Sequence, residues 1–192
     1  PLPMGTVGTD FDTYTAWMDA CGIPATHVTR IDEALTAQAF ITTDLDDNQI
    51  TAFHPGAMNF AASNKIDAAA GVTIGIIAPD GRDGMIEHAA QFASAGIPFI
   101  FDPGQGMPMF DGSDLKRFIE QATWVTVNDY ESELMQDRTG MSAAAIAGQV
   151  DALIVTRGGE GSTIFRDGSE IAIPSAAVDA VVDPTGCGDA YR

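Results

Sequence analysis

The clearest strand signal in the chain is Thr123-Trp124-Val125-Thr126-Val127, which runs directly into Asn128-Asp129-Tyr130-Glu131. A short apolar, β-branched run that ends in polar residues is typical of a buried strand. Similar runs, each bounded by Gly, Pro, Asp or Asn, occupy residues 73–78, 98–101 and 152–156. Segments of helical composition alternate with them, at residues 81–95, 113–121 and 142–150. This rhythm predicts an α/β fold, Rossmann-like, with a mostly parallel sheet flanked by helices.

The ends of the predicted strands indicate one shared binding site. Asn128, Thr156 and Gly186 each follow a strand-like run. Ligands of open α/β sheets bind beyond the carboxyl ends of the strands, which meet at one edge. We therefore expect these three residues to line a single crevice.

A second pattern lies outside this rhythm. Residues 36–43 and 49–54 are strand-like and are joined by Asp44-Leu45-Asp46-Asp47-Asn48, a turn-forming stretch. Such a pair predicts a β-hairpin. We expect residues 33–57 to carry this hairpin as an insertion in a single domain that spans residues 1–192.

The composition bounds the class of protein. A chain of 192 residues with 45% hydrophobic residues can bury one core. It contains neither an apolar stretch of about 18 residues nor a basic-then-apolar signal sequence. We therefore expect no membrane partner and a cytoplasmic location. Cys21 and Cys187 do not make a disulfide framework, and Cys187 is interpreted as a packing residue rather than a nucleophile.

The net charge of −18 argues against nucleic acid as a partner, since phosphate backbones need clustered Lys and Arg. A nucleotide can still bind where backbone N–H groups and a divalent cation make the phosphate contacts. The many aspartates are interpreted as a strongly solvated surface, with adaptation to salt as a second interpretation.

The last residues carry the chemistry. Asp183-Pro184-Thr185-Gly186-Cys187-Gly188-Asp189 contains a Gly-X-Gly turn followed by an aspartate where a helix could begin. Such a turn aims backbone N–H groups at one point, and a helix start favours an anion. An aspartate beside that point could accept a proton from an attacking hydroxyl, which is what phosphoryl transfer requires. The plainer interpretations are a tight turn and an acid that stabilises a helix start.

These features resemble the ribokinase-like carbohydrate and nucleoside kinases of the phosphofructokinase B (pfkB) type. The family's Asp-X-X-Gly-X-Gly-Asp matches residues 183–189, its Asn-X-X-Glu matches residues 128–131, and its Thr-X-Gly-X-X-Gly matches residues 156–161. The stretch from Phe101 to Phe110 is most similar to the bacterial adenosine kinase-like branch.

The resemblance implies an ATP-dependent kinase that phosphorylates a nucleoside hydroxyl, with the adenosine 5′-hydroxyl favoured. Asp189 would be the general base, and the amides of Gly186, Cys187 and Gly188 would hold the transferring phosphoryl group. Two alternatives stay open: a kinase for a free sugar such as ribose or fructose, and an inactive nucleotide-binding fragment.

The resemblance also assigns cofactor contacts. Asn128 and Glu131 would organise hydrated Mg²⁺ and the ATP phosphates, with Glu131 as the metal ligand. The nucleotide-binding residues would be Thr156, Gly158 and Gly161, and Asp183 would bind a monovalent cation such as K⁺.

Each of these assignments has a plainer counterpart. Asn128 and Glu131 would equally form a capping box at a helix start. Arg157 is expected to face solvent, and Asp102 is either near the phosphates or a cap of its turn.

The hairpin supplies the substrate candidates Gln38, Phe53 and His54, with Phe53 either stacking on a base or sugar or packing across the strands. The resemblance implies that residues 33–57 form a small β lid over the substrate. Family lids often pair between subunits, so a homodimer through the lid is expected. The chain also looks cut at both ends relative to family members, and we expect it to be inactive by itself.

Overall fold

The structure is a computed structural model that describes residues 1–45, 49–182 and 186–191. The chain divides into two compact units, one formed by residues 1–71 and 80–88 and the other by residues 72–79 and 89–192. The helix α2 (Arg82–Ala95) contributes to both. None of the helices in the described ranges has the length and apolar character that a membrane crossing needs.

The first unit contains two small sheets. Strands β1 (Met4–Val7) and β2 (His27–Arg30) are parallel and are connected through α1 (Asp12–Ala20). Strands β3 (Gln38–Thr43) and β4 (Gln49–His54) form an antiparallel hairpin whose register pairs Gln38 with His54. Two 3₁₀ segments follow, η1 (Gly56–Ser63) and η2 (Ile66–Ala68). The turn expected at residues 44–48 lies partly outside the described residues.

The second unit is built on a six-stranded sheet in the order β10-β9-β8-β7-β6-β5. The parallel part comprises β5 (Gly75–Ile77), β6 (Phe99–Phe101), β7 (Trp124–Asn128) and β8 (Ala152–Thr156). The strands β9 (Ser162–Arg166) and β10 (Ser169–Ile173) extend it in antiparallel fashion. The predicted α/β class is confirmed, with an antiparallel edge that the prediction did not contain.

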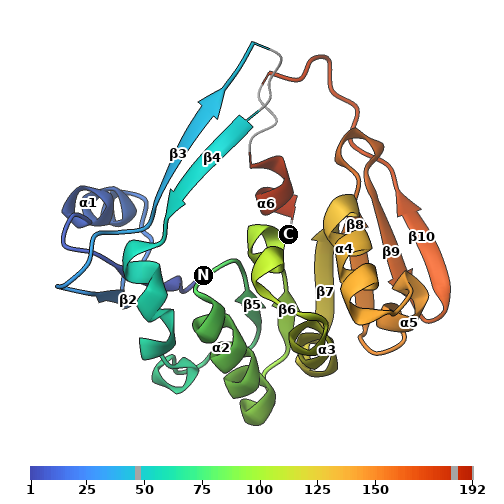
Figure 1. The fold of residues 1–192 in the computed structure, drawn as a ribbon, viewed down its shortest axis with the longest axis horizontal. Coiled ribbons are helices and arrows are strands. Elements are labelled where there is room, and N and C mark those ends of the chain that lie inside the picture. Colours follow the sequence, from blue (N-terminus) through green and yellow to red (C-terminus); the bar gives the residue numbers. More distant parts are fainter. Residues whose placement is uncertain (46–48, 183–185, 192) are drawn as a thin grey trace. The chain divides into compact units, whose positions relative to one another are not determined.

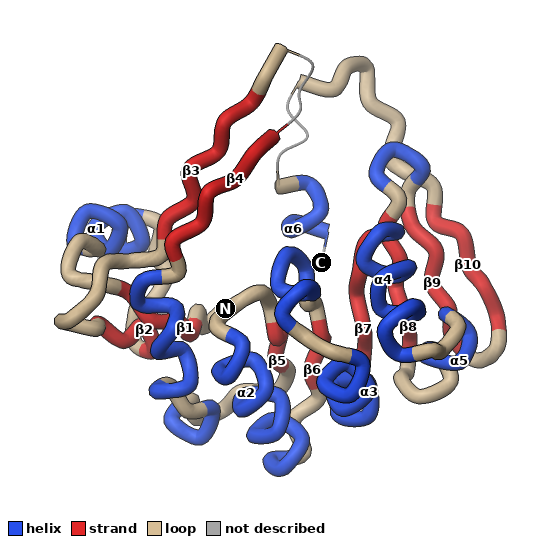
Figure 2. Tube along the Cα trace, viewed as in Figure 1, coloured by secondary structure: helices blue, strands red, loops and turns tan. Residues whose placement is uncertain are grey.

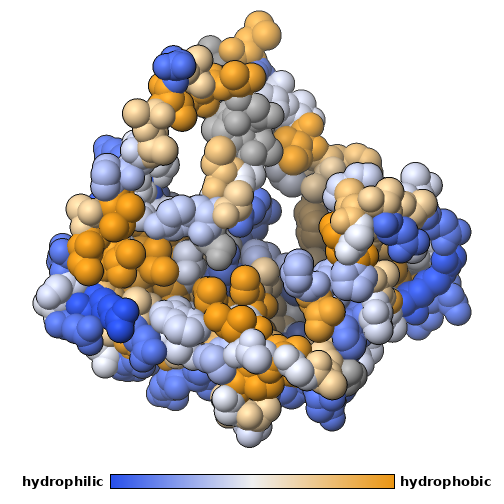
Figure 3. Space-filling model, turned by 180° about the vertical axis from the view of Figure 1, so that it is seen from behind, coloured by the Kyte–Doolittle hydropathy of each residue, from blue (hydrophilic) through white to orange (hydrophobic). Residues whose placement is uncertain are grey.

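Helices of this unit cover one face of the sheet. In Figures 1 and 2, α3 (Gly112–Gln121), α4 (Asp129–Thr139) and α5 (Ala143–Ala147) lie on the viewer's side of the strands. The rings of Phe101 on β6 and Phe118 on α3 stack with their centroids 4.2 Å apart, and both residues are buried. The opposite sheet face is less covered: Ile76 is 54% exposed whereas its neighbour Ile77 is 4% exposed. The view from behind in Figure 3 shows apolar surface in patches.

Candidate active site

The carboxyl ends of β7 and β8 form the base of the candidate site. Asn128 and Thr156 are the last residues of their strands and are direct Cα partners in the parallel ladder. Thr156 is in turn the partner of Ser162, where β9 begins. The predicted convergence of two strand ends is therefore observed in the backbone register.

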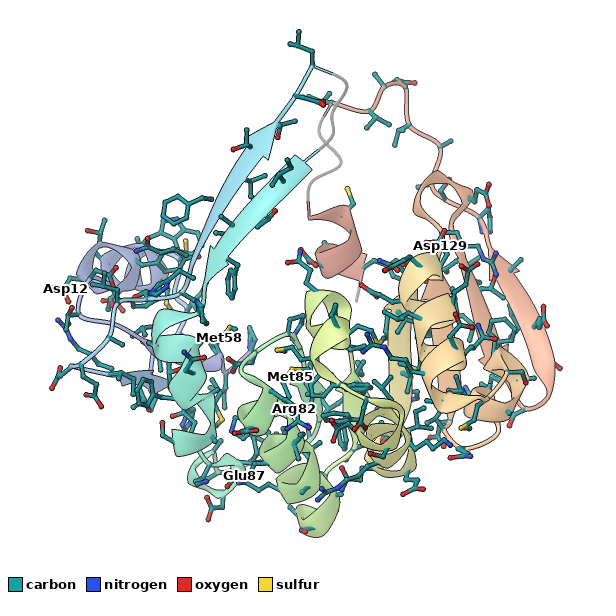
Figure 4. All side chains as sticks on the ribbon, in the orientation of Figure 1. Asp12, Met58, Arg82, Met85, Glu87 and Asp129 are labelled. Atoms are coloured by element: carbon teal, nitrogen blue, oxygen red, sulfur yellow. The ribbon has the colours of Figure 1, made fainter. Side chains whose placement is uncertain are left out.

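The helix start after β7 is fixed by a reciprocal pair of hydrogen bonds. The Glu131 N–H donates to Asn128 Oδ1 over 2.7 Å, and the Asn128 N–H donates to Glu131 Oε2 over 2.8 Å. This capping box begins α4, and Figure 4 labels the helix's first residue, Asp129. The capping interpretation is confirmed, and it holds the buried carboxylate of Glu131 at the strand end. The magnesium role of Glu131 stays a prediction.

The turn after β8 brings the predicted nucleotide residues into one short loop. It contains η4 (Gly158–Glu160), and the Arg157 N–H donates to the Gly161 carbonyl over 2.8 Å. Arg157 and Gly158 are exposed, as expected for Arg157, and Thr156 is half-buried. The loop therefore presents its backbone to solvent directly beyond the strand end.

Gly161 has a structural requirement of its own. Its φ is +91°, and a Cβ atom there would lie 2.1 Å from the Ile173 carbonyl oxygen. Only glycine combines that backbone conformation with so close an approach. The glycine in this motif position is explained by the turn into β9, whether or not it also contacts a nucleotide.

The short helix α6 (Cys187–Tyr191) joins this group. Its terminal Tyr191 Oη lies 2.6 Å from Ser162 Oγ, so the end of α6 reaches the first residue of β9 through this side chain. Gly186, with φ of +77°, precedes the helix, and its carbonyl accepts from the Ala190 N–H over 2.9 Å. Asp189 is in the first turn and is exposed. Asp183 and its two following residues lie outside the described part of the chain.

Asp102 is buried at the carboxyl end of β6. Its backbone N–H donates to the Ile77 carbonyl over 2.9 Å, and the 3₁₀ segment η3 (Gly104–Met109) follows. The residue thus lies at the same edge of the sheet as Asn128 and Thr156. Its two predicted roles, near the phosphates or capping the turn, both remain consistent with this place.

The substrate candidates do not all share one face of the hairpin. Gln38 and His54 are direct partners and project to the same face, whereas Phe53 is one residue along and projects to the other. A single ligand bound on one face would contact either Phe53 or the Gln38–His54 pair. The hypothesis that all three bind one substrate therefore needs both faces of the hairpin.

Gln38 also lines a hollow of about 620 Å³ in the first unit, together with Asp10, Tyr14 and Trp17. Asp10 Oδ1 accepts from the Thr36 hydroxyl (2.7 Å) and from the Thr36 N–H (2.8 Å), and Gln38 Nε2 donates to Asp10 Oδ2 over 3.3 Å. The hydrogen bond from the Thr36 side chain, then that from its backbone, lowers the pKa of Asp10. The ionised carboxylate ties the start of α1 to the base of the hairpin.

The oxygen atoms of Asn128 and Glu131 are the candidate metal ligands at the strand ends. Within residues 1–45, 49–182 and 186–191, no three His, Cys, Asp or Glu side chains are arranged to hold a metal ion by themselves. Magnesium does not need such a cage, because it binds through one or two carboxylates, waters and substrate phosphates. Glu131 and Asn128 supply oxygen atoms of the kind that this coordination uses.

With this geometry, comparison with known proteins identifies the family. The model of the pfkB family of carbohydrate kinases matches residues 3–192. The chain belongs to this family. Its fold is that of ribokinase-like kinases, in agreement with the resemblance inferred from the motifs.

Relatives in the family include nucleoside kinases. The nucleoside kinase of Methanocaldococcus jannaschii is 31% identical over 98% of this chain and 63% of its own length. The structure of Burkholderia thailandensis nucleoside kinase in complex with inosine is 50% identical with a TM-score of 0.93, covering 98% of this chain and 62% of that chain. The same kinase in complex with ADP-inosine gives a TM-score of 0.92. The chain thus spans somewhat less than two thirds of these relatives.

Two residues at the site were not predicted. Ser162 and Tyr191 belong to motif segments, but their hydroxyls are joined across 29 residues of sequence. Strand and helix patterns are local and carry no signal for such a pair.

Proposed function

We propose that the protein transfers the γ-phosphoryl group of ATP to the 5′-hydroxyl of a purine nucleoside, yielding a nucleoside monophosphate and ADP. One observation carries the proposal: Asn128, Thr156 and the helix of Asp189 meet at one edge of the sheet, the last through the Ser162–Tyr191 contact. Adenosine is the acceptor that the resemblance of residues 101–110 favours. The complex of the Burkholderia thailandensis relative makes inosine the second acceptor to compare.

In the proposed reaction, the Asp189 carboxylate accepts the proton of the 5′-hydroxyl as its oxygen attacks the γ-phosphorus. The bond from that phosphorus to the bridging oxygen breaks, and ADP leaves. The amides of Gly186, Cys187 and Gly188 hold the phosphoryl oxygens while negative charge redistributes over them. Asp189 is exposed on α6 and so can be reached by an acceptor.

The nucleotide-binding assignments complete the proposal. The exposed turn of Gly158 contacts the ATP phosphates, with Thr156 beneath it and Gly161 closing the turn. Glu131, with Asn128, would hold Mg²⁺. The bound ion would neutralise negative charge on the ATP phosphates during transfer. The K⁺ role of Asp183, a homodimer through the hairpin and a cytoplasmic location stay predictions from the sequence.

The first test is the variant Asp189→Asn in the complete gene product, because the relatives are longer than this chain. We expect kcat to fall by about 10²–10⁴-fold, the usual contribution of a general base, with the KM for ATP little changed. The exposed Asp137→Asn on α4 is the matched control and should retain full activity. Full activity in Asp189→Asn would refute the base assignment.

A panel of acceptors tests the function itself. Adenosine, inosine, ribose and fructose are offered with Mg·ATP, and ADP release is followed. Higher kcat/KM for a nucleoside than for either sugar supports the proposal, and preference for ribose or fructose would replace it with a sugar kinase. Calorimetry of Mg·ATP with the complete gene product addresses the third alternative, since measurable binding without turnover of any acceptor is the behaviour of an inactive nucleotide-binding protein.

A further inference from the structure

Two hydroxyl side chains from distant segments meet beside the candidate site. Ser162 is the first residue of β9 and is 4% exposed, and Tyr191 is the last residue of α6. Their oxygen atoms lie 2.6 Å apart, and either hydroxyl can donate. A buried serine hydroxyl is costly unless it is hydrogen-bonded, so this partner matters to Ser162.

The segment before α6 gives it little support. Residues 174–182 contain neither helix nor strand, and all of them are exposed. The hydrogen bond between Tyr191 and Ser162 is a contact that joins α6 to the sheet.

The contact lies where it can orient the reacting groups. Ser162 is the Cα partner of Thr156 at the carboxyl end of β8. Tyr191 follows Asp189 by two positions, which is a rotation of about 200° around a helix. The Tyr191 hydroxyl can thus hold α6 on one side while the Asp189 carboxylate points to a different side.

We propose that Ser162 and Tyr191 are a positioning pair that fixes α6, and with it Asp189 and the Gly186–Gly188 amides, against the strand end that binds the phosphates. This inference rests on the proposed function. Neither hydroxyl touches the reacting atoms. Both act through the placement of Asp189, to which a shift of a fraction of an ångström matters.

The kinetic test uses Tyr191→Phe, Ser162→Ala and the double variant in the complete gene product. Loss of one hydrogen bond predicts a fall in kcat of about threefold to tenfold. The KM values for ATP and nucleoside should stay within about twofold, and the double variant should be no worse than the more impaired single variant, since both remove the same bond. A role in global stability would instead lower the melting temperature and leave kcat unchanged.

A second readout does not depend on activity. The Ala190 N–H donates to the Gly186 carbonyl over 2.9 Å, so hydrogen exchange in the peptide of residues 186–191 reports the order of α6. We expect exchange in this peptide to accelerate in both single variants, with the rest of the protein unchanged. The exposed Ser169→Ala on β10 is the control and should behave as the parent protein does.

The outcomes separate the two claims. The positioning pair is overturned if kcat and the exchange of residues 186–191 are both unchanged, or if the two single losses add in the double variant. If the parent protein phosphorylates no acceptor, the proposed function fails, and the exchange measurement alone then decides whether the pair holds α6.

Discussion

Asp80 shows how a single residue makes stability depend on pH. Burial raises the pKa of its carboxyl, while the Gly81 N–H, which donates to Asp80 Oδ1 over 2.7 Å, and the nearby His88 act in the opposite direction. A raised pKa means that the folded state binds the proton more tightly than the unfolded chain. Its contribution to the free energy of unfolding is therefore most favourable below the ordinary pKa of 3.8 and is lost as pH rises through the raised value.

We therefore predict that Asp80→Asn increases the free energy of unfolding at pH 7. The amide keeps an oxygen for the Gly81 N–H and removes the cost of the half-buried charge. The gain should shrink as pH falls and vanish below the ordinary pKa of 3.8, which urea titrations at several pH values would measure.

The control for this prediction is Asp83→Asn, which removes the same charge from a side chain that is 86% exposed. It should give a smaller change with no comparable pH dependence. Equal effects from the two variants would show that net charge, rather than burial of Asp80, is responsible.

At the scale of elements, Arg138 joins α4 to η3. It lies in the last turn of the helix, and its Nη1 donates to the carbonyls of Met107 (2.9 Å) and Pro108 (3.3 Å) and also to that of Phe110. These carbonyls end the 3₁₀ segment that follows Asp102. The guanidinium thus fixes the loop beyond β6 to the helix that begins with the Asn128–Glu131 capping box.

We predict that Arg138→Met lowers the free energy of unfolding by about 2–3 kcal/mol, since the hydrogen bonds from a charged donor to three backbone carbonyls are lost. Chemical denaturation measures the change. Arg117→Met on α3, where the side chain is exposed, should cost well under half as much. Similar losses in the two variants would contradict the assigned role of Arg138.

The β9–β10 hairpin has a turn signal in its sequence, whereas the parallel pair β1–β2 has none. The β9–β10 connection places Asp167 at φ +52° and Gly168 at φ +73°, the conformation that favours Asp-Gly in tight hairpins. This Asp-Gly pair is a hairpin signal that the strands expected from the sequence do not include. The parallel pair β1–β2 had no such signal, because its strands are joined through a helix and pair across more than twenty residues.

For the whole molecule, the dominant physical feature is the net charge of −18. The described ion pairs, such as Arg30–Asp12 at 2.6 Å, are exposed and contribute little stability. Self-repulsion of the acidic surface should therefore oppose folding at low ionic strength.

We predict that the melting temperature at pH 7 rises as NaCl increases from about 0.05 to 1 M, by about 2–4 °C for each kcal/mol of repulsion that is screened. Calorimetry or circular dichroism measures it. Repeating the series at the acidic pH where the net charge is close to zero is the control. A salt effect of equal size there would contradict the electrostatic origin.

Hydrophobic periodicity and turn chemistry are local properties, so the order of residues alone was enough to predict the α/β class, the strands β5–β8, the helices α2 and α3, and the motifs of the kinase family. The tertiary structure alone decided that the Ser162 hydroxyl meets the Tyr191 hydroxyl. It also decided which face of the β3–β4 hairpin Phe53 occupies. The Ser162–Tyr191 contact and the close approach of Gly161 to the Ile173 carbonyl join atoms that lie 29 and 12 residues apart in the sequence. Packing in three dimensions brings these groups together, because burial and hydrogen bonding reward proximity in space whatever the distance along the chain.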